Sequence, residues 1–241
     1  MTMRVFSERQ RSLGLVTLAM VVLEVVASVM VAAVYDFDAT ALAADPGMFP
    51  ARGSEVAGLL RWGGVVDMLG YLALAPIVLY LHGRLGATVS ERVRALGLIS
   101  LLTFSGLGFV LVGSIGAVLI ASVGPPLLDA SAVGSETAAA ARVAFAALGN
   151  GVLVGLWGML ELPLLGVWLI GVGWLMRAEG RAFGWLAVVA GVGALSYGAR
   201  TALSGRPPVD FTAPLDVLIL GAVGLFFAWL AWLAVRLWQG R

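Results

Sequence analysis

The sequence contains no cysteine and no lysine, because all fifteen of its basic residues are arginine. Without cysteine there are no disulfides, thiolate metal sites or cysteine nucleophiles, and without lysine there is no Schiff base or P-loop contact. The single histidine, His82, excludes a haem held by two histidines of this chain. No metal-ligand spacing such as Glu-x-x-His is present either. We therefore expect no cofactor and no metal, and an intramembrane enzyme is the least favoured functional class.

Charge is also scarce. Only 12% of the 241 residues are charged, whereas 61% are hydrophobic, and the mean hydropathy is +1.00. A soluble domain of this size carries about twice that share of charge. The composition predicts a single all-α transmembrane domain over residues 1–241, in contact with membrane lipid.

Six apolar runs are each long enough to cross about 30 Å of hydrocarbon as a helix of roughly 20 residues. The first exceeds the apolar region of a secretory signal, so we expect it to be a retained anchor. The predicted spans are residues 13–34, 56–81, 95–123, 144–176, 183–203 and 214–237.

Arginine is distributed unequally between the two sets of span ends. One set carries most of it, and the connections at the other set are rich in Asp and Glu. By the positive-inside rule the arginine-rich face is cytoplasmic, which predicts a multi-pass protein of the inner (plasma) membrane with both termini in the cytoplasm. This basic face is an orientation signal and does not indicate nucleic-acid binding. The residues that define it are Arg4, Arg9, Arg11, Arg84, Arg92, Arg94, Arg177, Arg181, Arg236 and Arg241, against Asp36, Asp38, Asp45, Glu55, Asp129, Glu136 and Asp210.

Proline interrupts two of the predicted spans. A proline inside a helix removes a backbone donor and clashes with the preceding turn. Pro76 and Pro163 therefore predict kinked second and fourth helices. In the fourth span, Gly151 and Gly155 have the small-xxx-small spacing that lets helices approach closely. We expect the glycines of the spans to pack inside the bundle rather than on a homo-oligomer face. Besides this pair they are Gly106, Gly113, Gly116, Gly191 and Gly221, which stand among bulky neighbours.

Seven ionisable residues fall within or at the edge of the spans, where charge is costly and normally faces a bundle interior or a wet cavity. Counting about 1.5 Å per residue places the carboxylates of the first, second and fourth spans near or just outside the midplane, and the arginines nearer the outer boundary. We expect a polar cavity that opens to the outside and narrows toward Glu24, Asp67 and Glu161. The seven candidates for ligand binding or proton coupling are Glu24, Arg61, Asp67, Arg142, Glu161, Arg200 and Asp216.

Two interpretations of these charges remain open. They can pair among themselves, for example Arg61 with Glu161 or Arg200 with Asp216, and so fix helix register. Alternatively they form a site, in which the arginines suit an anionic or amphipathic ligand and the carboxylates suit proton coupling. Arg61 and Asp67 are six residues apart, about 240° of helix rotation, so they cannot share one face.

The stretch from Leu59 to Leu81, LLRWGGVVDMLGYLALAPIVLYL, resembles a segment in a family of bacterial six-helix membrane proteins of unknown function, as does Leu148 to Gly155. The resemblance implies a fold and no activity. Arginine-only basic usage with abundant Ala, Gly and Val is also typical of a bacterial source. For function we expect binding or transport of a small ligand or lipid through the outer-facing cavity, with a structural or interaction subunit of a larger membrane complex as the alternative.

Overall fold

The computed structural model describes residues 2–38, 45, 47–91, 97–207 and 213–240, and over these residues it is helical with no strand. Six helical segments are long and apolar enough to cross a membrane, which confirms the predicted all-α class with six spans. Their bounds are Gln10–Val34, Gly53–Ala87, Leu98–Ala130, Ser135–Met176, Arg181–Ser204 and Pro214–Trp238. The chain is therefore an integral membrane protein.

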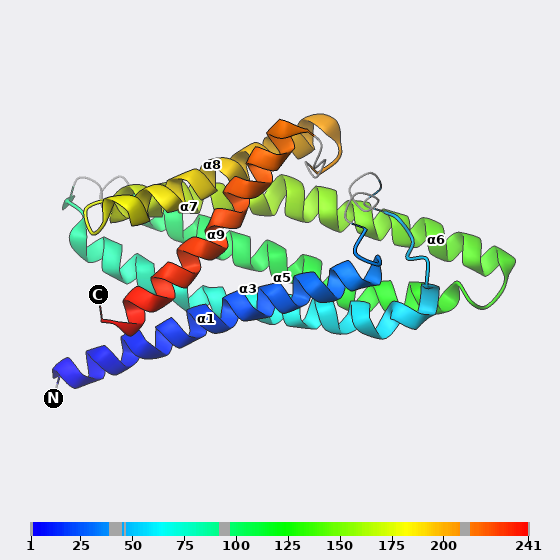
Figure 1. Cartoon of the computed structure of the whole chain (residues 1–241), viewed down its shortest axis with the longest axis horizontal. Coiled ribbons are helices and arrows are strands. Elements are labelled where there is room, and N and C mark those ends of the chain that lie inside the picture. Colours follow the sequence, from blue (N-terminus) through cyan, green and yellow to red (C-terminus); the bar gives the residue numbers. More distant parts are fainter. Residues whose placement is uncertain (1, 39–44, 46, 92–96, 208–212, 241) are drawn as a thin grey trace.

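Individual helices are named as in Figure 1. They are α1 (Thr2–Val34), η1 (Gly53–Val56), α3 (Ala57–Thr88), α5 (Leu98–Ala130), α6 (Ser135–Gly149), η2 (Asn150–Glu161), α7 (Leu162–Met176), α8 (Arg181–Ser204) and α9 (Pro214–Trp238). Of these, η1 is a short 3-10 helix and η2 has π geometry. The segments α6, η2 and α7 follow one another without a break and form the fourth span.

Three spans extend at least six residues beyond a predicted end, and the second span of the chain reaches Ala87 instead of residue 81. The helix α5 continues past residue 123 and through Pro125 and Pro126, because the side chain of Leu128 is fully buried and favours another helical turn. The fourth span begins at Ser135 instead of 144, since the alanines after it are strong helix formers. Pro76 lies inside a continuous α3, while Pro163 stands at the start of α7, so the predicted kinks stay predictions.

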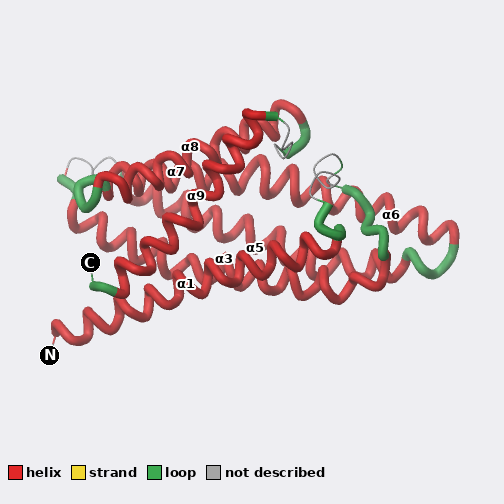
Figure 2. Tube along the Cα trace, viewed as in Figure 1, coloured by secondary structure: helices red, strands yellow, loops and turns green. Residues whose placement is uncertain are grey.

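The spans pack in chain order around a ring. Each contacts its neighbour in sequence, and α9 contacts α1 to close the ring. Both termini lie at the same end of the molecule, here called the terminal end, and the α5–α6 hairpin extends at the other, here called the distal end (Figure 1). Described loops are short and confined to these two ends (Figure 2). Arg92, Arg94, Asp210 and Arg241 lie outside the described residues.

Two apolar cores fill the bundle. The larger joins all six spans toward the terminal end and includes Leu74, Trp168 and Trp229. The smaller joins α1, α3, α5 and α6 toward the distal end around Val34 and Phe145. Between them, near the middle of the bundle, lie the carboxylates of α1, α3 and η2. The polar groups thus occupy a layer that neither core fills.

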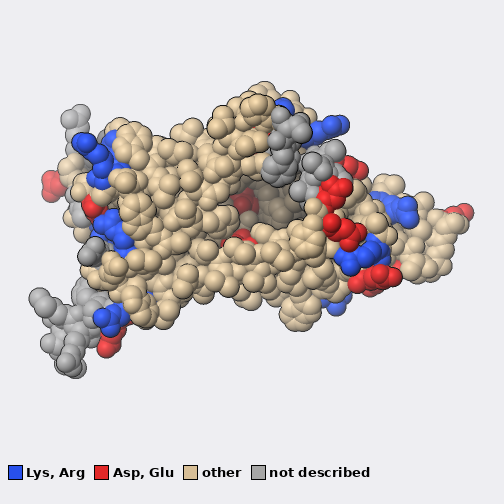
Figure 3. All heavy atoms as spheres, viewed as in Figure 1, with Lys and Arg blue, Asp and Glu red and all other residues tan. Residues whose placement is uncertain are grey.

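The outer surface is apolar across the middle of the molecule. Large side chains such as Leu15, Leu79, Phe104 and Leu218 are exposed there, as expected where lipid is the solvent. Charged side chains gather at the two ends (Figure 3). The exception in this view is a hollow in the uncharged band, within which acidic atoms are visible.

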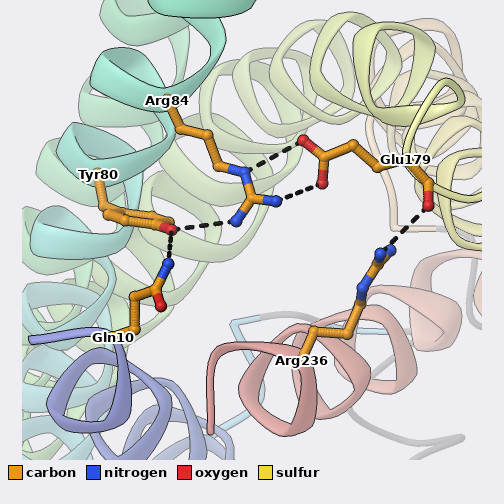
Figure 4. A network of polar contacts seen from close by, with 5 residues as sticks. All are labelled: Gln10, Tyr80, Arg84, Glu179 and Arg236. Atoms are coloured by element: carbon orange, nitrogen blue, oxygen red, sulfur yellow. Dashed lines mark hydrogen bonds and ion pairs between the residues drawn. The ribbon is translucent and has the colours of Figure 1, made fainter. Parts of the chain in front are cut away.

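A polar network ties four segments together at the terminal end (Figure 4). Arg84 of α3 donates to both carboxylate oxygens of Glu179, at 3.1 and 2.7 Å, and also to the Tyr80 hydroxyl at 3.1 Å. Gln10 of α1 donates to Tyr80 at 3.3 Å, and Arg236 of α9 donates to the backbone oxygen of Glu179 at 3.2 Å. The terminal end is therefore bound together by hydrogen bonds as well as by the larger core.

Candidate functional site

A cavity of about 350 Å³ lies in the layer between the two cores. It corresponds in place to the hollow of Figure 3, on the face where α1 and α9 diverge toward the distal end (Figure 1). Its described lining combines acidic and aromatic side chains with small apolar ones and contains no basic residue. The lining residues are Glu24, Ala27, Ser28, Val31, Ala32, Tyr35, Phe37, Asp38, Asp67, Tyr71 and Trp157.

Glu24 and Asp67 form the acidic wall of the cavity. Glu24 of α1 is only 8% exposed, and its Oε1 makes no hydrogen bond to any described residue. Its carboxyl group lies within hydrogen-bonding reach of that of Asp67 on α3. Gly70, one turn after Asp67, makes this approach possible, because a Cβ there would lie 2.2 Å from Glu24 Oε1. The sequence therefore brings two carboxyl groups together at one point of the cavity.

Glu161 lies behind the cavity and is linked to it through Tyr71. The Tyr71 hydroxyl donates a hydrogen bond of 2.7 Å to Glu161 Oε1, while Oε2 is buried without a hydrogen-bonding partner among the described residues. The ring of Tyr71 lines the cavity and packs edge-on against Phe109, with centroids 5.4 Å apart. Any change at the cavity wall that moves Tyr71 therefore also changes the environment of Glu161.

The π-helical segment η2 positions two of these side chains. Trp157 lines the cavity, and Glu161 is the last residue of the segment. A π-helix has i→i+5 hydrogen bonds, so residues about four to five apart, such as these two, lie above one another on the same side. Trp157 Nε1 donates to the backbone oxygen of Gly113 on α5 at 3.4 Å, which fixes its ring. Pro163 follows directly, and its lack of an N–H ends the π pattern. Segments of π-helix occur frequently at functional sites.

The mouth of the cavity is shaped by a turn after α1. Asp36 and Phe37 adopt positive φ angles of 51° and 61°, unusual for such residues, and the turn places Phe37 and Asp38 in the lining. An ion pair of 3.1 Å between Arg52 and Asp36 holds it. Burial, together with the charge of Asp45, raises the pKa of Tyr35 to about 12, so its hydroxyl is neutral at physiological pH.

The predicted arginines do not line this cavity. Arg61 is exposed and points away from Asp67, since a rotation of 240° leaves the two side chains about 120° apart around α3, and it does not pair with Glu161. Arg142 is exposed and lies over the ring of Phe49, 5.3 Å from its centroid. Arg200 forms the expected ion pair with buried Asp216, at 3.5 Å. Of the seven predicted site residues, only Glu24, Asp67 and Glu161 lie at or beside this cavity, while Arg200 and Asp216 pair with each other.

Sequence reasoning did not assign Tyr35, Phe37 and Asp38 to the site. No glycine directly follows α1 to mark a turn that folds back. The predicted internal packing is confirmed for Gly106, Gly113, Gly116 and Gly191, which lie against neighbouring helices. It is wrong for Gly151, Gly155 and Gly221, because nothing lies within 4 Å of a Cβ added at any of the three.

No protein-family model, curated protein or solved structure matches this chain. The resemblance to bacterial six-helix membrane proteins therefore stays a prediction.

Proposed function

We propose that this integral membrane protein binds a small amphipathic cation, such as an organic amine, in the acidic cavity. The observation that carries the proposal is the pairing of Glu24 and Asp67 in a cavity whose described lining has no basic residue. Buried carboxylates are costly unless a positive charge or a proton compensates them. A cationic group placed between them supplies that charge.

The aromatic lining supports an organic cation. Tyr35, Phe37, Tyr71 and Trp157 surround the space beside the two carboxyl groups, and aromatic faces attract ammonium groups through their quadrupoles. Among the described residues no group of three or more His, Asp or Glu side chains is placed to hold a metal ion. The lining therefore suits a diffuse organic cation better than a metal.

The shape and position of the cavity support an amphipathic ligand. Its volume falls at the lower end of the range of roughly 300–1,000 Å³ for small-molecule sites. It is hollowed into the side of the bundle, on a face otherwise exposed to lipid (Figure 3). A ligand with an apolar body can enter from the membrane and place its charged group at Glu24 and Asp67. The anionic ligand that the arginines suggested fits this lining poorly.

We propose from the arginine distribution that the terminal end faces the cytoplasm, in the inner (plasma) membrane of a bacterium. The cavity then opens toward the outer leaflet. Binding of the ligand follows from this placement. Transport across the membrane follows as well if the terminal end also opens.

The test compares two probes of nearly equal shape. Benzyltrimethylammonium carries a positive charge, and neopentylbenzene is its neutral carbon isostere. We expect the cation to bind the purified protein and the isostere to bind at least about tenfold more weakly, as expected for loss of a desolvated charge contact. Asp67→Asn should weaken cation binding by a similar factor.

Asp129→Asn is the matched control, because Asp129 is exposed on α5 and does not line the cavity. It should leave binding unchanged. Equal binding of the two probes, or equal binding by wild type and Asp67→Asn, would remove this cavity as a cation site.

A second function, as a structural subunit of a larger membrane complex or homo-oligomer, is favoured by one observation. Gly151 and Gly155 leave a strip of η2 open, and a helix of a partner can approach such a strip closely. Gly155→Leu should then abolish association on size-exclusion chromatography in mild detergent and leave cation binding intact. Unchanged elution would exclude this strip as an interface.

A further inference from the structure

A second cavity, of about 430 Å³, lies at the terminal end between the start of α8 and the end of α9. It is separate from the acidic cavity, and the cation-binding proposal does not use it. Its lining combines arginine with aromatic and apolar side chains. The residues are Glu179, Gly180, Arg181, Ala182, Phe183, Trp232, Val235, Arg236 and Gln239.

The net charge of this cavity is positive. Glu179 is the only acidic residue of the described lining, and both of its carboxylate oxygens are bonded to Arg84, which is outside the lining. Arg236 is held over the ring of Phe183, 4.9 Å from its centroid, and donates to a neutral backbone oxygen. Arg181 is exposed and makes no ion pair with a described residue. Two arginines therefore line the cavity without an ion pair to any carboxylate of the described residues.

The apolar part of the cavity continues onto the lipid-facing surface. Trp232 and Val235 of α9 line it and are 42% and 51% exposed, and Trp232 packs edge-on against Phe183 with centroids 5.4 Å apart. The first turn of α8 also points its free N–H groups toward this end, which favours a negative charge. The cavity thus offers positive groups at headgroup depth beside an apolar path for an acyl chain.

We infer that this cavity binds the phosphate headgroup of an anionic phospholipid, with Arg181 and Arg236 as its ligands. Guanidinium groups bind phosphate oxygens through paired N–H donors, and basic pockets between spans on the cytoplasmic side suit such headgroups. Free phosphate shares the headgroup chemistry but lacks the chains that would cover Trp232 and Val235.

Native mass spectrometry of the detergent-purified protein can test this assignment, with phosphatidylglycerol and phosphatidylcholine of the same acyl chains added at equal concentration. We expect phosphatidylglycerol to be retained preferentially. Arg181→Gln should reduce its retention about fivefold, the effect of one arginine near an anionic headgroup. Arg236→Gln should do the same, but Arg181→Gln is the more secure variant because its side chain is exposed and ties no helices together.

Arg177→Gln provides the matched control. Arg177 lies at the same end but stacks on Trp174, 3.3 Å from its ring centroid, and does not line the cavity. Its variant should retain phosphatidylglycerol as the wild type does. Equal retention of the two lipids, an Arg177→Gln loss as large as that of Arg181→Gln, or displacement of the lipid by an equal concentration of inorganic phosphate would each overturn the assignment. None of these outcomes bears on the acidic cavity.

Discussion

The ring of Tyr71 lies directly against the backbone of Gly113 on α5, and this contact allows a precise perturbation of the acidic site. A Cβ added at Gly113 would lie 2.1 Å from Tyr71 Cε1, against at least 3.4 Å for an ordinary contact. In Gly113→Ala the ring must therefore move by about 1.3 Å or the two helices must separate. Phe109 holds the ring from one side and the hydrogen bond to Glu161 holds its hydroxyl.

The cost of this substitution follows from three effects. Overpacking of a filled interior costs about 1–3 kcal/mol. Glu161 Oε2 already has no hydrogen-bonding partner among the described residues, so losing the Tyr71 hydrogen bond would leave Oε1 unpaired as well. This loss costs about 1–3 kcal/mol more. Replacing glycine by alanine within a helix returns about 1 kcal/mol. We expect a net loss of about 3 kcal/mol in the free energy of unfolding.

Thermal unfolding in detergent measures this loss. At about 2–4 °C per kcal/mol for a protein of this size, Gly113→Ala should lower Tm by about 6–12 °C. The control is Gly221→Ala on α9, where nothing lies within 4 Å of an added Cβ, and it should leave Tm unchanged or raise it slightly.

A double-mutant cycle tests whether Tyr71 is the group responsible. With Tyr71→Ala already in place, only the helix-propensity gain remains, so Gly113→Ala should raise stability by about 1 kcal/mol. This corresponds to a coupling free energy of about 4 kcal/mol between the two positions. If the two substitutions are additive within about 0.5 kcal/mol, the clash is elsewhere and the proposed support of Tyr71 by Gly113 is refuted.

Two further predictions concern the ends of the bundle. Because the chain has no cysteine, single cysteines introduced at Ala178 and Val133 report the orientation of the bundle directly. A membrane-impermeant maleimide added to intact cells should label Val133→Cys and not Ala178→Cys. The reverse labelling pattern would invert the proposed topology. Glu179→Gln removes the carboxylate that binds half-buried Arg84 and should lower stability by about 1–2 kcal/mol, measured as a fall in Tm. Asp36→Asn, which breaks the more exposed pair with Arg52, should cost less than about 0.5 kcal/mol. Equal costs would show that burial does not strengthen the terminal-end pair.

The sequence was sufficient to predict the six spans, because length and hydropathy alone decide which segments can cross a bilayer. Length and hydropathy predicted the ends of the second, third and fourth spans less accurately. Helix α5 passes through Pro125 and Pro126 because tertiary burial of Leu128 outweighs the lost backbone bonds, and no single-sequence pattern records that burial. The π geometry of η2 was equally hidden, since an apolar run has the same composition in either helix type.

Only part of the candidate site was predicted from the sequence. The depth of a residue along a helix is easier to count than the direction in which its side chain points around the helix axis. Counting along the helices placed Glu24, Asp67 and Glu161 at similar levels, and the structure brings them together. Arg61 was assigned to the same cavity by depth, although its 240° rotation from Asp67, about 120° the shorter way round, already excluded a shared face. Glycines on neighbouring helices show which way these side chains point, because Glu24 lies against Gly70 and Tyr71 lies against Gly113. Which glycine faces which side chain, however, depends on the packed structure and could not be predicted from the sequence.

The difference between the two ends of the bundle separates binding from transport. The acidic cavity reaches the middle of the molecule from the face near the distal end, and a ligand that only binds needs no other opening. Toward the terminal end its path is filled by the larger core, including Leu74 and Trp168, and then by the network of Arg84 and Glu179 that joins α3 to the α7–α8 connection. Transport would require this core to part and that ion pair to break, whereas binding leaves both intact. A protein that binds the cation while the Arg84–Glu179 pair stays closed is therefore a receptor for it, and only a ligand-linked opening of the terminal end would make it a transporter.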